Sequence, residues 1–260
     1  MRRVLVTGAS RRVGAHLVRS LCAAGDAVVF SYRRSEGEAR ALRDEMTAQG
    51  HRCEAIACDL LDAGDRDSLI ARAAEALGGL DALVNNASLF EYDTLDTLAE
   101  ARWQVHLDTN LKAPLFLTRD FARHVRAENI DKASALAPGR AVVVNLLDHK
   151  VTSPNPDYFS YTAGKMGLAG MIAPLAMACA PQVRVCAIAP GVTLPSGPQS
   201  ESDFHKAAAA TPLGITSSLD DVARALRFAL DTPSFCGQIL VVDGGEALVR
   251  RPRDVAFDEL

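Results

Sequence analysis

A tyrosine and a lysine stand one helical turn apart in the segment YTAGK. Tyr161 and Lys165 are spaced i, i+4, so on a helix they share one face. A tyrosine hydroxyl has a pKa of about 10 in model peptides and is a weak acid at neutral pH. A nearby ammonium group stabilises the phenolate and lowers that value. The pair therefore predicts a proton donor, Tyr161, with Lys165 as its electrostatic partner. The alternative is an exposed pair on a helix surface.

The segment TGASRRVG (7–14) joins an expected strand to an expected helix and could hold a phosphate. Gly8 and Gly14 bracket the turn. Glycine allows the backbone to approach a phosphate closely, and the amides at a helix N-terminus favour an anion. A strict GxGxxG is absent, so an ordinary strand-to-helix turn is the alternative.

Two arginine pairs follow the first two expected strands. Arg11 and Arg12 lie after the first strand, and Arg33 and Arg34, followed by Ser35, lie after the second. The carboxyl ends of adjacent parallel strands bring these loops together. An acidic residue at this point would bind a ribose 2′-hydroxyl, whereas arginine accommodates a 2′-phosphate. The sequence thus favours NADP over NAD, with a solvated basic edge as the alternative.

Two further loops follow expected strands. Asp59, after the third strand, could reach an adenine amino group or cap the helix expected from residue 63. NNAS (85–88) ends the fourth strand, and its small and amide residues would let a ribose approach. A plain turn is the alternative there.

Short β-branched runs alternate with longer helical patterns along the chain. This alternation indicates βα units and a parallel sheet in an α/β fold, and these elements must position the residues named above. Ligands bind outside the carboxyl ends of the strands in such sheets. The expected strands are about 3–7, 27–32, 52–57, 81–85, 140–146, 183–189 and 238–242. The expected helices are 12–24, 35–49, 63–78, 97–127 with a break near Asn110, 158–179 and 219–230.

Composition narrows the class of protein. The 260 residues are 48% apolar, and no linker divides them, so a single domain over 1–260 is expected. A net charge of −4 argues against a nucleic-acid partner, which needs a broad basic face.

Six cysteines without a CxxC pair predict reduced thiols in a cytoplasmic protein. The longest apolar run, 166–180, is too short for a membrane span and contains Pro174. No metal site is expected, and His106 and His149 are expected to be ordinary polar residues.

The order of motifs resembles that of the short-chain dehydrogenase/reductase family. The matching segments are TGASRRVG, NNAS, TNLKAP with Asn110, Tyr161-x-x-x-Lys165, APG (189–191) and VDGG (242–245). The resemblance implies a doubly wound Rossmann sheet of about seven strands and hydride transfer from the nicotinamide. Tyr161 would then be the proton donor, Lys165 would bind the nicotinamide ribose and Asn110 would hold a relay water. The residues assigned to NADP(H) binding are Gly8, Arg11, Arg12, Val13, Gly14, Arg33, Arg34, Ser35, Asp59, Leu60, Asn86, Ala87, Ser88, Tyr161, Lys165, Pro190, Gly191 and Thr193.

Two departures from the family pattern bear on the substrate. Arg12 stands where the family has glycine, and Asp148 stands where it has a serine thirteen residues before the tyrosine. The serine would donate a hydrogen bond to a ketone oxygen. An ionised aspartate cannot donate, and it would repel an alkoxide.

Both departures are similar to those in pteridine and dihydromonapterin reductases. The resemblance implies an NADPH-dependent reductase of a C=N bond in a pterin-like small molecule, with Asp148 relaying a proton or pairing with ring N–H groups. Phe90 would stack on the pterin, and the substrate residues would be Ser88, Phe90, Asp148 and Tyr161. Phe90 could instead belong to the core, and Asp148 could simply cap the loop that follows it.

Two other functions stay open from the sequence. One is a carbonyl reductase acting on a 3-oxoacyl thioester or another ketone, and the other is a non-catalytic NADP-binding regulator.

The Pro-, Ser- and Gly-rich segment 192–214 is expected to cover the substrate as a lid. The family implies a homotetramer or at least a dimer, and the tail 250–260 could reach a neighbouring subunit.

Overall fold

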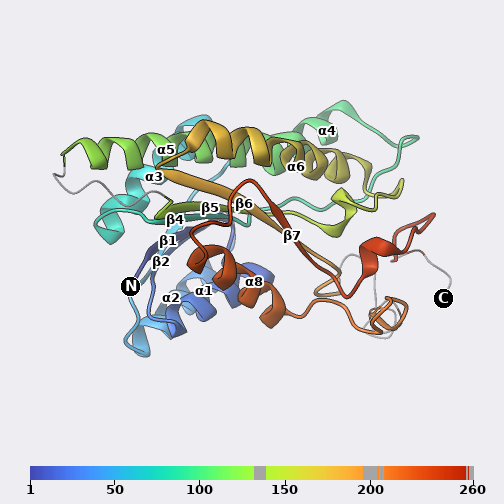
Figure 1. The fold of residues 1–260 in the computed structure, drawn as a ribbon, viewed down its shortest axis with the longest axis horizontal. Helices are drawn as coiled ribbons and strands as arrows, with labels where there is room; N and C mark the ends of the chain where they lie inside the picture. Colours follow the sequence, from blue (N-terminus) through green and yellow to red (C-terminus); the bar gives the residue numbers. More distant parts are fainter. Residues whose placement is uncertain (132–138, 196–203, 205, 207, 256, 258–260) are drawn as a thin grey trace.

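The computed structural model describes residues 1–131, 139–195, 204, 206, 208–255 and 257. Its centre is one parallel sheet of seven strands in the order β3-β2-β1-β4-β5-β6-β7 (Figure 1). The strands are β1 (Arg3–Val6), β2 (Ala27–Tyr32), β3 (Cys53–Ala57), β4 (Ala82–Asn85), β5 (Ala141–Leu146), β6 (Val183–Pro190) and β7 (Ile239–Val242). The predicted Rossmann fold is confirmed.

Helices cover both faces of the sheet. In Figure 1, α3, α4, α5 and α6 lie over one face and α1, α2 and α8 over the other. Their bounds are α1 (Arg12–Ala23), α2 (Glu36–Ala48), α3 (Ala63–Leu77), α4 (Glu100–Leu107), α5 (Ala113–Asp131), α6 (Phe159–Cys179) and α8 (Leu219–Asp231). Short helical turns are η1 (Asp108–Lys112), η2 (His149–Val151) and η3 (Glu246–Leu248).

The strand sequences are apolar almost throughout because both faces of the sheet are covered. β5, with the sequence AVVVNL, is buried along its whole length. Alternate side chains point to opposite faces, so Val4 packs in the cluster beneath α1 and α8 while its neighbour Leu5 packs in the cluster beneath α3 and α5. This framework places every β-to-α loop at one edge of the sheet.

The predicted break near Asn110 is a single π-helical turn. α4 ends at Leu107, η1 has π geometry over Asp108–Lys112, and α5 begins at Ala113. Such turns are short bulges in longer helices and are frequent at functional sites. Here the bulge carries Asn110, which is fully buried.

Three other sequence predictions meet the structure in different ways. The six cysteines are all free and five are buried. By length and composition α6 could cross a membrane, but Tyr161 and Lys165 on this helix are buried, which is the packing of a core helix. Part of the predicted lid, 196–203 with residues 205 and 207, falls outside the described residues. The lid and the homotetramer or dimer stay predictions.

Candidate active site

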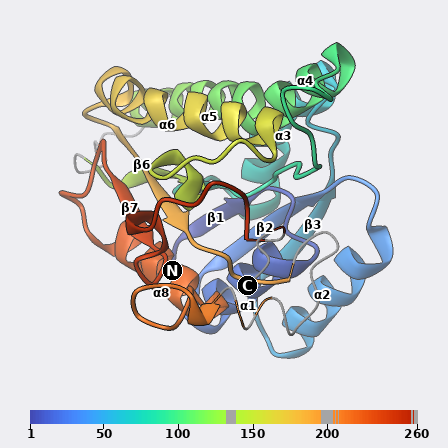
Figure 2. The ribbon, with the colours of Figure 1, turned by 90° about the vertical axis from the view of Figure 1, so that its right-hand side faces the viewer.

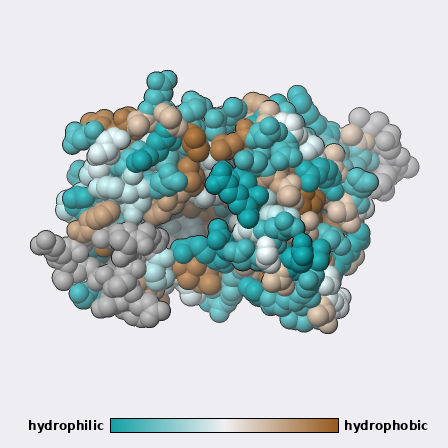
Figure 3. All heavy atoms as spheres, turned by 180° about the vertical axis from the view of Figure 1, so that it is seen from behind, coloured by the Kyte–Doolittle hydropathy of each residue, from teal (hydrophilic) through white to brown (hydrophobic). Residues whose placement is uncertain are grey.

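A pocket of about 700 Å³ lies at the carboxyl ends of the strands, the edge where this class of sheet binds ligands. Figure 2 looks toward this part of the molecule and shows the C-terminal segment crossing in front of the sheet. The face shown in Figure 3 is largely hydrophilic and is hollowed near its centre. All the residues predicted to bind cofactor or substrate line the pocket. Of the predicted catalytic residues, Asp148, Tyr161 and Lys165 line it as well, whereas Asn110 lies behind it.

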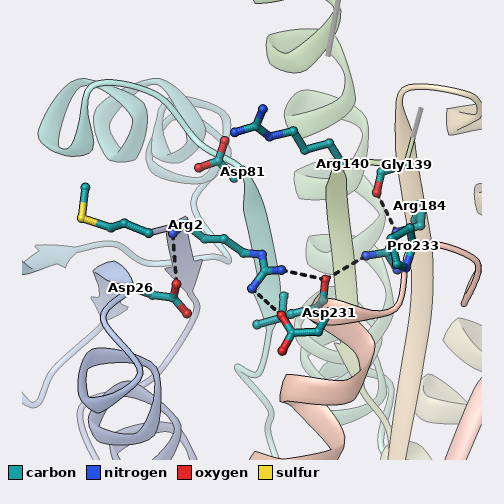
Figure 4. Close-up of a pocket in the computed structure, with 10 residues that line it drawn as sticks. Arg2, Asp26, Asp81, Gly139, Arg140, Arg184, Asp231 and Pro233 are labelled. Carbon is teal, nitrogen blue, oxygen red and sulfur yellow. Dashed lines mark hydrogen bonds and ion pairs between the residues drawn. The ribbon is translucent and has the colours of Figure 1, made fainter. Parts of the chain in front are cut away.

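A second hollow, of about 460 Å³, lies at the opposite edge of the sheet (Figure 4). Arg2 and Arg184, which line this hollow, make structural contacts. Arg2 forms an ion pair of 2.6 Å with Asp231, and Arg184 donates to the carbonyl oxygens of Gly139 at 2.8 Å and Leu230 at 3.2 Å. These contacts tie α8 to the edge of the sheet, far from the loops that could bind a dinucleotide.

The glycine-rich loop is packed too tightly for larger residues. Gly8 has a φ of +59°, and a Cβ there would lie 2.8 Å from Ala87 Cβ. A Cβ on Gly14 would lie 2.5 Å from Ala9 Cα. Arg12 has a φ of 53°, a left-handed conformation that costs a non-glycine residue energy. Its guanidinium donates to the Pro195 carbonyl oxygen at 3.0 Å, so the side chain joins this loop to the segment after β6.

The arginine side of the pocket is assembled from the loops after β1, β2 and β3. Ser10 and Ser35 share a hydrogen bond of 2.6 Å between their hydroxyl oxygens, which joins the first two loops. Arg33 lies 3.9 Å from Asp59. The alternative that Asp59 caps the next helix is wrong, because Asp62 is the N-cap of α3 and accepts from the Asp65 amide.

The loop after β4 is held from below by Asn110. The Asn110 amide oxygen accepts from Ser88 Oγ at 2.9 Å and from the Leu89 N–H at 3.0 Å, while its Nδ2 donates to the Leu89 carbonyl oxygen at 2.9 Å. Asn86 is tied to the first loop, since its Nδ2 donates to the carbonyl oxygens of Thr7 at 2.9 Å and Gly8 at 3.1 Å. The side chain of Asn110 therefore positions the loop directly, and its relay water stays a prediction.

The loop after β6 closes the pocket opposite the glycine-rich loop. The Gly191 N–H donates to the Val242 carbonyl oxygen at 3.0 Å, and a Cβ on Gly191 would lie 2.8 Å from Glu246 Oε2. Thr193 Oγ1 donates to the Gly191 carbonyl oxygen at 2.9 Å. Glycine at 191 thus lets the carboxylate of Glu246 approach the pocket wall.

Tyr161, Asp148 and Lys165 meet where β5 ends and α6 begins. The Tyr161 hydroxyl donates to Asp148 Oδ2 at 2.7 Å. Lys165 Nζ donates to the Leu146 carbonyl oxygen at 2.7 Å and lies 5.7 Å from the centre of the Tyr161 ring. Asp148 also accepts from the Lys150 N–H at 2.9 Å. The capping alternative for Asp148 is therefore correct, and the contact with Tyr161 exists beside it.

The protonation of this cluster differs from the sequence prediction. Burial, with a smaller effect from the Asp148 charge, raises the pKa of Tyr161 well above its ordinary value. Lowering of the Tyr161 pKa by Lys165 was expected and is not what the structure shows. Burial alone would raise the pKa of Asp148, but His149, the Lys150 N–H and the Tyr161 hydroxyl together hold it below its ordinary value. The favoured pair is a neutral Tyr161 donating to an ionised Asp148.

Phe90 lies at the pocket with aromatic neighbours. Its ring stacks on that of Tyr158 with 3.9 Å between centroids, and it meets the Tyr161 ring edge-on at 4.7 Å. Tyr158 is buried and has a φ of 54°, so a residue in a strained conformation supports one side of Phe90. Phe90 is half-buried and is not a core residue, and its stacking on a pterin stays a prediction.

The described part of the C-terminal tail folds back onto its own chain. Arg253 forms an ion pair with Asp157 at 2.8 Å, and Asp254 forms one with the buried Lys150 at 2.6 Å. Asp254 and Val255 line the pocket. Arg253 and Asp254 therefore contact their own chain, and the contact of the tail 250–260 with a neighbouring subunit stays a prediction.

Lys150 and Glu246 were missed by the sequence analysis, and His149 was expected to be an ordinary polar residue. Lys150 is fully buried, and His149 lies between Asp148 and the buried Glu246. The one available signal was position, because His149 and Lys150 directly follow Asp148 and Glu246 directly follows VDGG. The contacts between them join segments about 100 residues apart, which local patterns do not reveal.

Residues 2–205 match the model of the short chain dehydrogenase family. The chain therefore belongs to the short-chain dehydrogenases, a family of oxidoreductases that bind NAD(P) and act on small molecules.

Solved structures of similar chains include NADP complexes. FolM alternative dihydrofolate reductase 1 from Brucella suis, in complex with NADP, is 35% identical, has a TM-score of 0.87 and is matched over 96% of both chains. A short chain dehydrogenase from Burkholderia cenocepacia, also with NADP, is 30% identical with a TM-score of 0.83 over 94% of this chain and 97% of that one. The 3-oxoacyl-acyl-carrier-protein reductase of Staphylococcus aureus is 30% identical over 93% of this chain and 96% of its own.

The activity of the free enzyme is expected to fall as the pH rises through about 8. Burial lowers the pKa of Lys165 to about 8, so its positive charge is present below that pH and lost above it. Tyr161 does not titrate in this range because its pKa is raised well above its ordinary value. The pH profile of kcat/KM reports groups of the free enzyme and is the measurement to make.

Lys165→Arg provides the control, because a guanidinium keeps its charge at every pH of the assay. Its residual kcat/KM should lack the decline near pH 8. The same decline in wild type and variant would assign it to another group.

Proposed function

We propose that the protein is an NADPH-dependent reductase that transfers hydride to a C=N bond of a pterin-like substrate. The observation that carries this proposal is the hydrogen bond of 2.7 Å from the Tyr161 hydroxyl to Asp148, in a pocket that Phe90 also lines. A pterin offers ring N–H donors to a carboxylate and a flat face to an aromatic ring. The similarity to the Brucella dihydrofolate reductases supports it.

The cofactor proposal rests on the arginine side of the pocket. Arg11, Arg12, Arg33 and Arg34 all line it, together with Ser35. Guanidinium groups suit the divalent charge and the oxygens of a 2′-phosphate. The tight glycine-rich loop at the start of α1 suits the pyrophosphate, and bound NADPH would supply hydride from its nicotinamide.

The protein's own groups handle the proton. Reduction of a C=N bond puts one proton on nitrogen. Tyr161 lines the pocket and carries a hydroxyl proton, which it donates to Asp148 in the structure. Asp148 would also accept from a ring N–H of the substrate, since 21% of its side chain is exposed. Lys165 supplies positive charge beneath the pair.

A carbonyl reductase is the second candidate, since the Staphylococcus aureus relative is a 3-oxoacyl reductase. The site disfavours it. An ionised Asp148 would face the oxygen of a ketone, and the negative charge that grows on this oxygen during reduction would be repelled. The intact Tyr161 and Lys165 pair argues against a regulator without activity.

The test is initial-rate oxidation of NADPH by the wild-type enzyme with dihydrobiopterin or dihydromonapterin, beside an acetoacetyl thioester. We expect a higher kcat/KM for a pterin than for the thioester, and a higher kcat/KM for NADPH than for NADH. Turnover of the thioester without turnover of either pterin would favour the carbonyl reductase. Binding of NADPH with no hydride transfer to any substrate in a single turnover would favour the regulator.

A further inference from the structure

His149 lies between two carboxylates next to the proposed proton donor and has no role in the reaction described above. It is the first residue of η2, and 10% of its side chain is exposed. Its Nδ1 lies 3.2 Å from Asp148 Oδ1, and its Nε2 lies 3.5 Å from Glu246 Oε1. Because Asp148 Oδ2 accepts from Tyr161, four ionisable side chains stand in one row, in the order Tyr161, Asp148, His149, Glu246.

The Glu246 end of this row is held by backbone groups. Glu246 Oε2 accepts from the Val192 N–H at 3.2 Å. The turn that carries Glu246 is set by Asp243, which accepts from the N–H groups of Gly245 at 2.9 Å and Ala247 at 2.7 Å. Glu246 is therefore fixed next to the imidazole of His149, and only 2% of its side chain is exposed.

A doubly protonated imidazole donates hydrogen bonds from both ring nitrogens. A carboxylate beside each nitrogen, as His149 has here, can accept both of them. Among the described residues, Nδ1 has no aligned hydrogen-bond partner, even though the Asp148 oxygen is within ion-pair distance. Hydrogen bonds of this kind are often long or misaligned before the ligand binds and tighten afterwards. Three cations also act on the row. Lys165 lies 5.7 Å from the centre of the Tyr161 ring, Lys150 is paired with Asp254, and the charge of Arg251 lowers the pKa of Glu246.

We propose that His149 is the proton relay that reloads the Tyr161 and Asp148 pair, with Glu246 as the residue that positions its ring. This rests on the proposed function. His149 gives its Nδ1 proton to the Asp148 carboxylate. The Asp148 carboxyl group then protonates the Tyr161 oxygen as the Tyr161 hydroxyl proton passes to the substrate nitrogen.

The proton balance closes over one turnover. One proton reaches the substrate nitrogen, the Asp148 carboxylate and the Tyr161 hydroxyl are restored, and His149 is left neutral. A proton from solvent then restores the imidazolium. His149 lines the pocket, so solvent in the pocket can reach it. Without this relay, an ionised Asp148 beside a tyrosine of raised pKa has no proton to give.

The test compares His149→Asn and His149→Ala with wild type. Asparagine offers Nδ2 near the position of the imidazole Nδ1, so it can still orient Asp148, but it does not transfer a proton at neutral pH. We expect kcat with a dihydropterin to fall by about 10²-fold in both variants, the lower end of the range for general acid catalysis. NADPH affinity, measured by fluorescence titration, should stay within about twofold of wild type because the relay acts on proton transfer and not on binding.

Added imidazole is the decisive reagent. In His149→Ala the space left by the ring adjoins the pocket, so imidazole should restore rate in a saturable way and sodium chloride at equal ionic strength should not. A rate for His149→Asn within twofold of wild type would reduce His149 to an orienting residue and overturn the proposal, as would the absence of rescue in His149→Ala that still binds NADPH.

The outcome is separable from that of the proposed function. If wild type reduces the acetoacetyl thioester and neither pterin, the proposed substrate is wrong. The same variants can then be assayed with the thioester, because its carbonyl oxygen also takes up one proton. Loss and imidazole rescue on the thioester would retain the relay, and an unchanged rate would remove it.

Discussion

Asp148→Ser is expected to lower kcat for a dihydropterin by about 10²- to 10⁴-fold, the range that a general acid contributes. The serine hydroxyl cannot take up a proton from His149 or pass one to Tyr161, and it removes the carboxylate that a pterin N–H would meet. Reduction of a 3-oxoacyl thioester should be unchanged or faster, since serine donates to a carbonyl oxygen. Initial rates with both substrates measure the effect.

Asp148→Asn is the matched control because it keeps the shape of the side chain and an oxygen that can accept from the Tyr161 hydroxyl. In the wild-type structure this hydroxyl lies 2.7 Å from Asp148 Oδ2. It should lose pterin reduction to a similar extent, because an amide carries neither the charge nor a transferable proton. Pterin turnover within about threefold of wild type in both variants would show that Asp148 serves the loop and not the reaction.

Lys150→Met is expected to lower the free energy of unfolding by about 3–5 kcal/mol, the cost of breaking a buried ion pair from one side. The Lys150 ammonium lies 2.6 Å from Asp254 and 2.8 Å from Asn155 Oδ1, with 2% of the side chain exposed. Methionine fills a similar volume and leaves the Asp254 carboxylate buried without this cation. The thermal midpoint should fall by roughly 6–20 °C, as calorimetry or circular dichroism would record.

Lys112→Met provides the comparison within the same chain. Lys112 pairs with Asp108 at 3.2 Å, but 47% of its side chain is exposed, and exposed pairs contribute about 0–1 kcal/mol. The unfolding free energy of this variant should lie within that range of wild type. Equal stability of the two variants would mean that the Lys150 and Asp254 pair does not hold the C-terminal segment in place.

The same contact links stability to the substrate end of the pocket. Asp254 and Val255 line the pocket, and their position depends on Lys150 and on the Arg253 contact with Asp157. If substrate binds against this wall, as the proposed function expects, initial rates should show that Lys150→Met raises KM for the substrate more than it lowers kcat, because Asp254 and Val255 line the pocket and do not carry the transferred proton.

The sequence by itself determined the sheet, the helices and most of the pocket. Continuous apolar, β-branched runs such as AVVVNL are typical of strands buried on both faces, and parallel strands bring every following loop to one edge. Gly8, Arg34, Asn86 and Tyr161 were therefore predictable as neighbours, and all four line one pocket. Even the break near Asn110 was visible, because TNLKAP interrupts a long helical pattern.

The tertiary structure alone decided the protonation of the site and the contacts behind it. The i, i+4 spacing of Tyr161 and Lys165 suggests a lowered tyrosine pKa, but a pKa depends on burial and on every charge nearby. Burial, with a smaller effect from the Asp148 carboxylate, raises the pKa of Tyr161 instead. Likewise, His149 meets Glu246, and Lys150 meets Asp254. Each partner lies about 100 residues away in the chain, and a contact over that distance follows from how loops pack on the finished sheet, which no local pattern encodes.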